Sequence, residues 1–246
     1  MQLVCLMAGS SSRLLPLTET RHKACLNLGD RTMLAHQLDI FTQSGISKTT
    51  FVLGHGAVEL ASALFDGLKH SLFTLIHNPH FSTCNLDWSA WLGLSSVSGP
   101  VVYYEGDLLV PPSLLKELHT HPADICIALD SACDHDSRDT LVLGSENKVE
   151  RLLFVEHGIA NSSPEDQALG EFICSVKFSD QARRFVVDAL ASQPFKGPMQ
   201  LYRIFEKAFS CFSTAFVDAR GRPWYEVDNH QDLDRASILA KEILAS

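Results

Sequence analysis

Short apolar runs alternate with longer amphipathic segments along the first third of the chain. Residues 3–7 are apolar without interruption, which is typical of a strand buried on both faces. Residues 31–41 carry apolar side chains at helical spacing and therefore predict a helix. Residues 50–54 and 72–76 predict two further buried strands, with a helix over residues 58–68 between them. This alternation predicts an α/β fold with a doubly wound, mostly parallel sheet.

The alternation continues less regularly toward the end of the chain. Residues 130–139 and 162–167 are polar and are predicted to be loops. A last helix is predicted after Asn229, which is a good N-cap, with Asp232 in its first turn. The other predicted elements are helices over residues 86–94, 113–118, 180–191 and 199–209, strands over residues 100–107, 123–129, 170–178 and 215–217, and a hairpin of residues 140–143 and 148–154.

Length and composition place the chain among ordinary globular proteins. Its 246 residues suffice for one large α/β domain or two small ones, and we predict a single domain over residues 1–246. The formal net charge of −9 argues against general nucleic-acid binding and against an anionic membrane surface. No run reaches membrane-spanning length, no signal peptide is recognisable, and the seven cysteines are scattered, so we expect a cytoplasmic protein.

Small residues follow the first predicted strand at once and suggest an anion-binding loop. A loop this small lets backbone N–H groups approach an anion closely. Arg13 ends the loop with a planar fork of donors for phosphate oxygens, and Lys23 adds a second cation. No Gly-Lys-Ser/Thr closes the loop and G-x-G-x-x-G is absent, so it is neither a Walker P-loop nor a dinucleotide fingerprint. We therefore predict a polyphosphate site whose loop consists of Ala8, Gly9, Ser10, Ser11 and Ser12.

Two aspartates are candidates for holding a metal ion beside that site. Asp107 follows an apolar strand and a glycine, so it projects from the carboxyl edge of the predicted sheet. Mg²⁺ prefers hard oxygen ligands and takes one or two carboxylates together with substrate phosphates. Asp228 stands just before the last predicted helix, where a carboxylate gains little unless it has a cation.

Three motifs give the chain a more specific resemblance. Residues 7–18, MAGSSSRLLPLT, and 22–26, HKACL, resemble the signature of nucleotidyltransferases of the sugar-1-phosphate and phosphocholine type, roughly LAAGx(G/S)SRLxPLT followed by PKxLL. Residues 105–107, EGD, resemble the (D/E)GD motif of these enzymes. Residues 224–236, WYEVDNHQDLDRA, resemble a third motif, Wx(E/D)(I/V)D(T/N)xxDLxxA. The motifs come in the family's order and span almost the whole chain.

The resemblance implies a Rossmann-like, GT-A-like nucleotidyltransferase fold with a small β-rich acceptor-binding portion. Residues 1–110 would form the nucleotide-binding half, and residues 111–246 the acceptor-binding half with the C-terminal helix. In the implied reaction, an acceptor phosphate or phosphonate oxygen attacks the α-phosphorus of a nucleoside triphosphate and pyrophosphate leaves. The chain departs from the signature at Met7, where Ala is usual, and at His22, where Pro is usual.

The resemblance also implies roles for single residues. Arg13 would hold the triphosphate, and Lys23 would neutralise the α-phosphate and the incoming acceptor, so both are implied catalytic residues. Asp107 and Asp228 would hold the Mg²⁺ cofactor. The implied nucleotide-binding residues are Leu6, Ala8, Gly9, Ser10, Ser11, Ser12, Asn78, Asn85 and Ser89.

The segment that begins at Asn78 allows two interpretations. In the resembled family, an N-P-x-(F/Y) segment with a following Asn and Ser lies beside the nucleotide base, and Asn85 and Ser89 match those places. An Asn amide offers both a donor and an acceptor, and it can therefore read a pyrimidine edge. In the other interpretation, Asn78 and Pro79 form a turn and Asn85 caps a helix.

Within the family, the chain looks closest to the phosphocholine and 2-aminoethylphosphonate cytidylyltransferases. This implies CTP and a small phosphorylated or phosphonate acceptor with a cationic head as partners. An aromatic face with carboxylates would bind such a head by cation–π attraction and charge pairing. Trp224 is a candidate for that face, and it is equally consistent with packing before the last strand. The implied acceptor-binding residues are Tyr104, Glu105, Asp130, Glu171, Trp224 and Glu226.

Two other functions stay open on the sequence alone. The same chemistry with a sugar or polyol phosphate would require neutral hydroxyl partners, which the sequence does not distinguish. A catalytically inactive nucleotide-binding regulatory module of the same fold is disfavoured, because such modules tend to lose the charged groups that this chain keeps at Arg13, Lys23, Asp107 and Asp228. The sequence does not indicate an oligomeric state.

Overall fold

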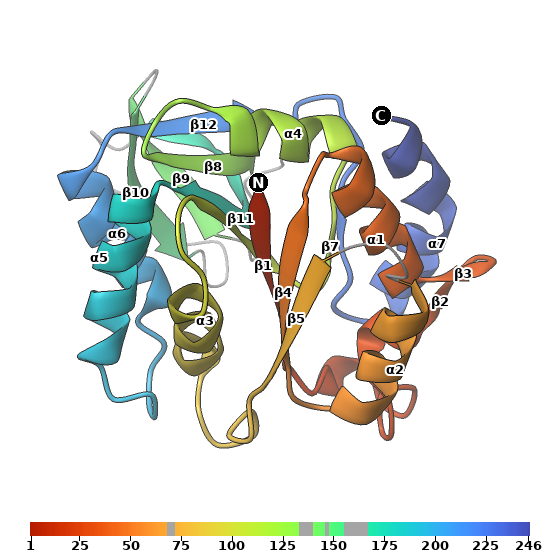
Figure 1. Cartoon of the computed structure of the whole chain (residues 1–246). Coiled ribbons are helices and arrows are strands. Elements are labelled where there is room, and N and C mark those ends of the chain that lie inside the picture. Colours follow the sequence, from red (N-terminus) through yellow and green to blue (C-terminus); the bar gives the residue numbers. More distant parts are fainter. Residues whose placement is uncertain (68–71, 133–139, 146–147, 155–166) are drawn as a thin grey trace.

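In the computed structural model, a twisted central sheet lies between two layers of helices (Figure 1). Most of the predicted loop over residues 130–139 and of the one over residues 162–167 lies outside the described residues. The structure describes residues 1–67, 72–132, 140–145, 148–154 and 167–246.

The predicted elements are present in the described ranges, with small shifts of their ends and some additions. The helices are α1 (Met33–Gln43), α2 (Ala57–Gly67), α3 (Leu86–Ser95), α4 (Pro112–Thr120), α5 (Asp180–Ala191), α6 (Leu201–Cys211), α7 (His230–Ala245) and the short 3₁₀ helices η1 (Ser12–Leu14) and η2 (Lys23–Cys25). The strands are β1 (Gln2–Met7), β2 (Asn27–Leu28), β3 (Arg31–Thr32), β4 (Lys48–Leu53), β5 (Leu72–His77), β6 (Val101–Glu105), β7 (Leu108–Leu109), β8 (Ile125–Asp130), β9 (Thr140–Ser145), β10 (Lys148–Phe154), β11 (Gln167–Phe178), β12 (Thr214–Asp218) and β13 (Tyr225–Glu226).

The uninterrupted apolar run at the start of the chain forms β1, a central strand of the main sheet. β1 pairs in parallel with β4 on one side and with β6 on the other. Leu3, Cys5 and Met7 belong to the hydrophobic core on one face of the sheet, and Val4 and Leu6 belong to the core on the other. Each of residues 3–7 therefore faces an apolar layer, as the sequence predicted.

The main sheet has the order β12-β8-β11-β6-β1-β4-β5, and β9 and β10 continue along the first part of β11. Of its described strands, only β10 and β11 run against the direction of β1. The prediction of a mostly parallel sheet is therefore confirmed. The predicted hairpin is also confirmed, because β9 and β10 pair in antiparallel register.

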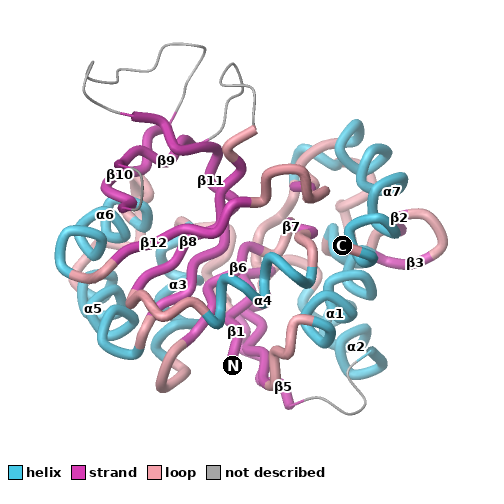
Figure 2. The backbone as a smooth tube through the Cα atoms, turned by 90° about the horizontal axis from the view of Figure 1, so that it is seen from above, coloured by secondary structure: helices cyan, strands magenta, loops and turns pink. Residues whose placement is uncertain are grey.

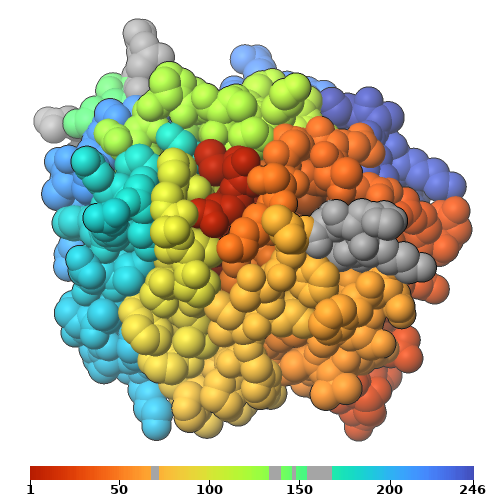
Figure 3. Space-filling view, in the orientation of Figure 1, coloured from red at the N-terminus to blue at the C-terminus, as the bar shows by residue number. Residues whose placement is uncertain are grey.

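Helices cover both faces of the sheet, which confirms the doubly wound architecture. Helices α1, α2, α4 and α7 contribute to one core, and α3, α5 and α6 to the other (Figures 1 and 2). Figure 3 shows the first residues of the chain at the surface, between segments coloured yellow and orange. At its other end, the carboxyl end, β1 leads into the loop that begins at Ala8. Within the described ranges, no helix has the length and apolarity needed to cross a membrane.

The first helix begins later than its apolar spacing predicted. Arg31 and Thr32 form β3, which pairs with β2 in a small hairpin, and the Thr32 hydroxyl accepts from the Ala35 N–H (3.2 Å). Helix α1 therefore starts at Met33 rather than at residue 31. Apolar spacing alone could not separate a short strand and a cap from the first helical turn.

Asp87 connects two helices that are far apart in the sequence. Its carboxylate accepts from the backbone N–H groups of Gln200 (2.9 Å) and Leu201 (3.0 Å), at the start of α6. The side chain of Asp87 is fully buried in α3. A carboxylate at a helix start satisfies N–H groups that have no partner within the helix. Asp87 therefore fixes α6 against α3.

We expect Asp87→Asn to lower the free energy of unfolding by about 1–3 kcal/mol, because one amide N–H₂ would replace an oxygen that accepts from a buried backbone donor. Asp188→Asn is the matched control, since Asp188 is exposed on α5 and should change stability by less than about 0.5 kcal/mol. Urea unfolding of the two variants measures the difference. Equal midpoints would contradict the proposed role of Asp87.

Candidate active site

Local backbone contacts shape the loop after β1. Ser11 has a φ of 51°, in the left-handed region, and turns the chain into η1, which carries Arg13. The Leu14 N–H donates to the Ser11 carbonyl oxygen (2.9 Å), and the Thr18 hydroxyl donates to the same oxygen (2.8 Å). A Cβ added at Gly9 would meet nothing within 4 Å. The loop therefore has a fixed shape and borders open space.

Two glycines bring the neighbouring strand ends close to this loop. A Cβ at Gly54, after β4, would lie 2.5 Å from the carbonyl oxygen of Ala8. A Cβ at Gly106, after β6, would collide with the carbonyl oxygen of Leu6, to which the Gly106 N–H donates (3.0 Å). Only glycine permits so close an approach of two backbones. The glycine after β6 thereby places Asp107 beside the loop.

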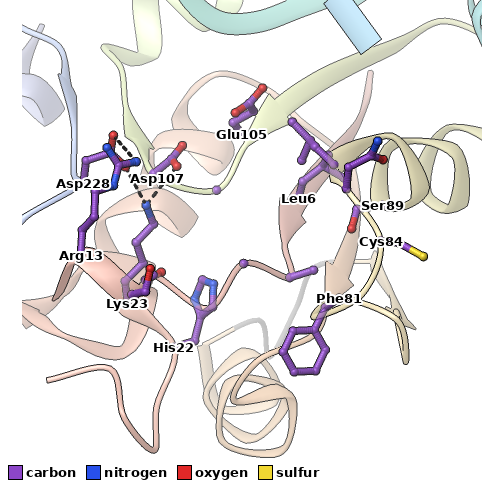
Figure 4. Close-up of a pocket in the computed structure, with 17 residues that line it drawn as sticks. Leu6, Arg13, His22, Lys23, Phe81, Cys84, Ser89, Glu105, Asp107 and Asp228 are labelled. Atoms are coloured by element: carbon purple, nitrogen blue, oxygen red, sulfur yellow. Dashed lines mark hydrogen bonds and ion pairs between the residues drawn. The ribbon is translucent and has the colours of Figure 1, made fainter. Parts of the chain in front are cut away.

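A cavity of about 330 Å³ lies at the carboxyl ends of β1 and β6 (Figure 4). This is the sheet edge at which a parallel α/β fold binds its ligands. Most of the residues predicted for nucleotide binding and catalysis line the cavity, whereas Ser10 is exposed and does not. The lining residues are Leu6, Ala8, Gly9, Ser11, Ser12, Arg13, His22, Lys23, Phe81, Cys84, Asn85, Leu86, Ser89, Glu105, Gly106, Asp107 and Asp228.

Lys23 connects this cavity to two carboxylates from distant parts of the chain. Its Nζ lies 3.0 Å from Asp107 Oδ2 and 3.6 Å from Asp228 Oδ1, and it donates to the Val227 carbonyl (2.8 Å). Arg13 Nη2 lies 2.8 Å from Asp228 Oδ2. Burial alone would lower the pKa of Lys23, but the two aspartates outweigh burial and raise it. Lys23 is therefore an ammonium ion held in place by oxygens.

The carboxylates also fit a divalent cation. Asp107, Glu226 and Asp228 each offer an oxygen, and these oxygens lie within 4.8 Å of one another. Asp107 Oδ1 is buried and has no hydrogen-bond partner in the described part of the chain. Such an atom is costly unless a donor or a cation meets it, and carboxylate oxygens are the ligands that Mg²⁺ prefers. The two predicted metal ligands are thus brought together, and Glu226 joins them.

Two glutamates near this cluster resist ionisation. Burial, followed by the charges of Asp107 and Asp228, raises the pKa of Glu226 to about 9. Burial and Asp107 raise the pKa of Glu105 to about 7, although Glu105 accepts from the hydroxyls of Tyr103 and Tyr202 at 2.7 Å each. Both shifts have the same two causes, which are burial of the carboxyl group first and the negative charge of neighbouring aspartates second.

The asparagines predicted to lie beside a nucleotide base make local structural contacts. Asn78 is buried, donates to the Ser89 hydroxyl (2.9 Å), accepts from the His80 N–H (2.8 Å) and does not line the cavity. Asn85 caps α3 by accepting from the Asp87 N–H (3.1 Å), and it lines the cavity together with Ser89. The turn-and-cap interpretation therefore describes the side-chain oxygens of both residues, and the Asn85 amide N–H₂ also donates to the Gly197 carbonyl oxygen (3.3 Å). A role beside the base stays a prediction.

A second cavity of about 380 Å³ adjoins the first, and Asp228 lines both. The Trp224 Nε1–H donates to Asp130 Oδ2 (2.9 Å), which fixes the indole. Of the residues predicted to bind the acceptor, three line this cavity, Glu105 lines the first cavity, and Asp130 contacts Trp224. The lining residues of the second cavity are Glu171, Trp224, Tyr225, Glu226, Asp228 and Asp232.

The structure does not bring Tyr104 to either cavity. Side chains alternate along β6, so Tyr104 faces away from Tyr103 and Glu105. Its ring is fully buried and lies edge-on to Phe41, with a centroid distance of 5.2 Å. Its hydroxyl donates to the Leu108 carbonyl (2.8 Å). Tyr104 is therefore a core residue, and the sequence could not tell which face of β6 it occupies.

Several residues of the site were not predicted from the sequence. Phe81 and Cys84 line the first cavity from the segment between β5 and α3, and Phe81 is the aromatic residue of the N-P-x-(F/Y) match. His22 lines the cavity at the position where the resembled signature usually has Pro. Tyr202 reaches Glu105 from α6, and no local sequence signal pointed to it.

Comparisons with known proteins agree with the resemblance. Residues 2–75 match the family model described as nucleotidyl transferase. A stretch of 128 residues, 51% of this chain, is 30% identical to CMP-5'-(3-aminopropyl)phosphonate synthase of Streptomyces rubellomurinus. That stretch covers 20% of the relative, so the chain spans only a fifth of the relative's length.

Solved structures of nucleotidyltransferases share the fold over nearly the whole chain. The inositol-1-phosphate CTP transferase from T. maritima superposes with a TM-score of 0.79 at 19% identity, covering 98% of this chain and 95% of that one. The CTP:phosphocholine cytidylyltransferase from Streptococcus pneumoniae superposes with a TM-score of 0.73 at 18% identity, covering 97% and 98%. The chain therefore has the nucleotidyltransferase fold, as the three motifs implied.

Proposed function

We propose that this chain is a Mg²⁺-dependent cytidylyltransferase, which transfers CMP from CTP to a small phosphorylated or phosphonate acceptor with a cationic amino group and releases pyrophosphate. The observation that carries the proposal is the meeting of two cavities at Asp228. One cavity has cations and a small-residue loop suited to a triphosphate, and the other has carboxylates and an indole suited to a cationic head. An acceptor bound in the second cavity would direct its phosphate or phosphonate oxygen toward the first.

The groups around the first cavity support roles in phosphate binding. Arg13 is largely exposed at the cavity rim, so its guanidinium can turn from Asp228 to the triphosphate and follow pyrophosphate as it leaves. Lys23 is buried and held between Asp107 and Asp228, so it offers a fixed positive charge for the α-phosphate and the attacking oxygen. The N–H groups and hydroxyls of Ser11 and Ser12 complete the cradle.

The carboxylates would hold the metal ion. Asp107 and Asp228 are the proposed Mg²⁺ ligands, and the unpartnered Oδ1 of Asp107 is the atom that most requires a cation. When bound, Mg²⁺ supplies Lewis-acid stabilisation of charge at the α-phosphate. Little covalent help from the protein is required, because holding the attacking oxygen and the leaving group in line does most of the work.

The second cavity supports an acceptor with a positive head. Its acidic side chains are Glu171, Glu226, Asp228 and Asp232, and cationic side chains are absent from its lining among the residues that the structure describes. The indole of Trp224 adds an aromatic face whose orientation is fixed by Asp130. The similar proteins named for CMP-aminopropylphosphonate synthesis and for CTP:phosphocholine cytidylyl transfer support the same choice of nucleotide and acceptor.

We expect pyrophosphate release when the protein is given Mg²⁺, CTP and either 2-aminoethylphosphonate or phosphocholine. The assay crosses CTP, UTP, dTTP, ATP and GTP with these two acceptors, glycerol phosphate and glucose-1-phosphate. Release with a sugar or polyol phosphate alone would keep the chemistry and exclude the cationic acceptor. If no combination released pyrophosphate and calorimetry still detected nucleotide binding, the result would favour an inactive binding module.

We expect Lys23→Met and Asp107→Asn each to lower kcat by at least about a hundredfold, because each removes a charge placed at the reacting phosphate. Lys207→Met and Asp188→Asn are the matched controls, since both side chains are exposed and neither lines either of the two cavities. Initial rates and circular dichroism are measured for all four variants. A well-folded Lys23→Met or Asp107→Asn variant with near-normal turnover would contradict the assigned roles.

We expect Trp224→Leu to raise the KM for the cationic acceptor by about 5- to 30-fold, the loss of one partly desolvated cation–π contact, and to leave the KM for CTP unchanged. Trp224→Phe keeps an aromatic face without the hydrogen bond to Asp130. Its KM for the acceptor should lie between those of the unchanged protein and Trp224→Leu. Steady-state kinetics with each substrate varied in turn provide the measurement. A lower melting temperature with both KM values unchanged would instead assign Trp224 a packing role.

A further inference from the structure

His22 occupies an unusual place in the first cavity. It immediately precedes Lys23, it is 2% exposed, and its side chain nevertheless lines the cavity. Figure 4 shows its ring beside Lys23, pointing into the space between Lys23 and Phe81. The resembled signature usually has Pro at this position, which offers no polar side-chain atom. The imidazole is therefore an addition that the shared motif does not explain.

The backbone fixes which nitrogen of the ring carries the proton. His22 is the N-cap of η2, and its Nδ1 accepts from the Ala24 N–H (3.1 Å). A nitrogen that accepts a hydrogen bond cannot itself be protonated, so the ring is neutral and its proton is on Nε2. Burial, followed by the charge of Lys23, lowers the pKa of His22 to about 3, in agreement with a neutral ring.

The Nε2–H is a donor without a protein partner. Of the residues that the structure describes, none accepts a hydrogen bond from it, although the residue is almost entirely buried. The nitrogen opens into the cavity and is not enclosed in the core, so its acceptor is either water or a ligand bound in the cavity. The ring faces the cavity whose other groups are Arg13, Lys23 and the serine loop, all of which suit phosphate oxygens.

Neighbouring backbone holds the imidazole in this position. A Cβ added at Gly56 would lie 2.6 Å from the His22 backbone nitrogen, so the turn before α2 packs directly behind the residue. The Ala24 N–H of η2 fixes the ring itself by donating to its Nδ1. With its position set from two sides, the donor requires little reorganisation to meet a ligand.

We infer that His22 is a phosphate-binding residue, whose neutral Nε2–H donates to an oxygen of the polyphosphate chain of the nucleotide. This inference rests on the proposed function, because it takes the first cavity as the triphosphate site. A neutral donor adds a hydrogen bond beside Lys23 without placing a second buried cation there. His22 would thus complement Lys23 in holding the phosphates.

Two variants separate the donor of His22 from its capping role. His22→Asn places an amide oxygen at about the reach of Nδ1, so it can keep the cap while losing the donor at Nε2. His22→Gln places an amide nitrogen at about the reach of Nε2, so it can keep the donor while losing the cap. His230→Asn is the matched control, since His230 is exposed at the start of α7.

The measurement is calorimetric binding of CTP with Mg²⁺ and of cytidine alone, in the absence of acceptor, together with thermal melting. We expect His22→Asn to weaken CTP binding by about 10- to 100-fold, the loss of one hydrogen bond to a charged group, without changing cytidine binding. His22→Gln should bind CTP within about threefold of the unchanged protein, even if it melts at a lower temperature.

Three outcomes would overturn the inference. CTP binding of normal strength in His22→Asn would show that the donor is not used. Weak binding in His22→Gln alone would assign His22 a capping role, and equal losses for cytidine and CTP would indicate a general distortion of the cavity. If the unchanged protein bound CTP but gave no pyrophosphate in the acceptor grid, the proposed function would fail while this comparison stayed valid.

Discussion

The site depends on one buried ammonium group. Lys23 Nζ is surrounded by Asp107 Oδ2, Asp228 Oδ1 and the Val227 carbonyl oxygen, which come from the middle and the end of the chain. A buried ammonium is stable only when such partners replace water, and the carboxylates are stable there only because of the ammonium. The backbone supports the same junction, because β13 pairs with β7 and the Val227 N–H donates to the Asp107 carbonyl (3.0 Å). The three motifs thus converge on one ion cluster.

The cluster also bears on how a chain with a net charge of −9 would bind the proposed anionic substrate. Arg13 and Lys23 pair with carboxylates here, so their positive charge is largely neutralised within the chain. In the proposed reaction, a metal ion at the carboxylates would free the exposed Arg13 to turn toward the phosphates, whereas Lys23 would stay held by the Val227 carbonyl oxygen. Burial first, and the charge of Asp107 second, raise the pKa values of Glu105 and Glu226, so a cation at the carboxylates would relieve part of this strain. Metal and triphosphate binding are therefore expected to favour each other.

The sequence predicted the sheet well, and it singled out charged residues that the structure brings together, because both depend on local patterns. Burial on both faces requires an uninterrupted apolar run, which the sequence of β1 shows. The loop after β1, Lys23, Asp107 and Asp228 belong to motifs that come in a fixed order along the chain. Predictions that depended on side-chain direction were less successful. Tyr104 turned to the core because alternation along β6 placed Glu105 on the other face, and the donation from Tyr202 to Glu105 joins residues 97 positions apart. Such contacts require the tertiary fold, which no local pattern contains.

Capping residues link local structure to chemistry in this site. Asp232 accepts from the N–H groups of Asp228 (3.1 Å) and Asn229 (3.0 Å), so the capping box of α7 fixes the backbone from which Asp228 reaches Lys23. Asn85 caps α3 at the cavity wall, and His22 caps η2 with one nitrogen while the other faces the cavity. A cap and a functional group are therefore not competing explanations for a polar residue at a helix start. A side chain with two polar atoms can satisfy the helix with one and present the other, already positioned, to a ligand.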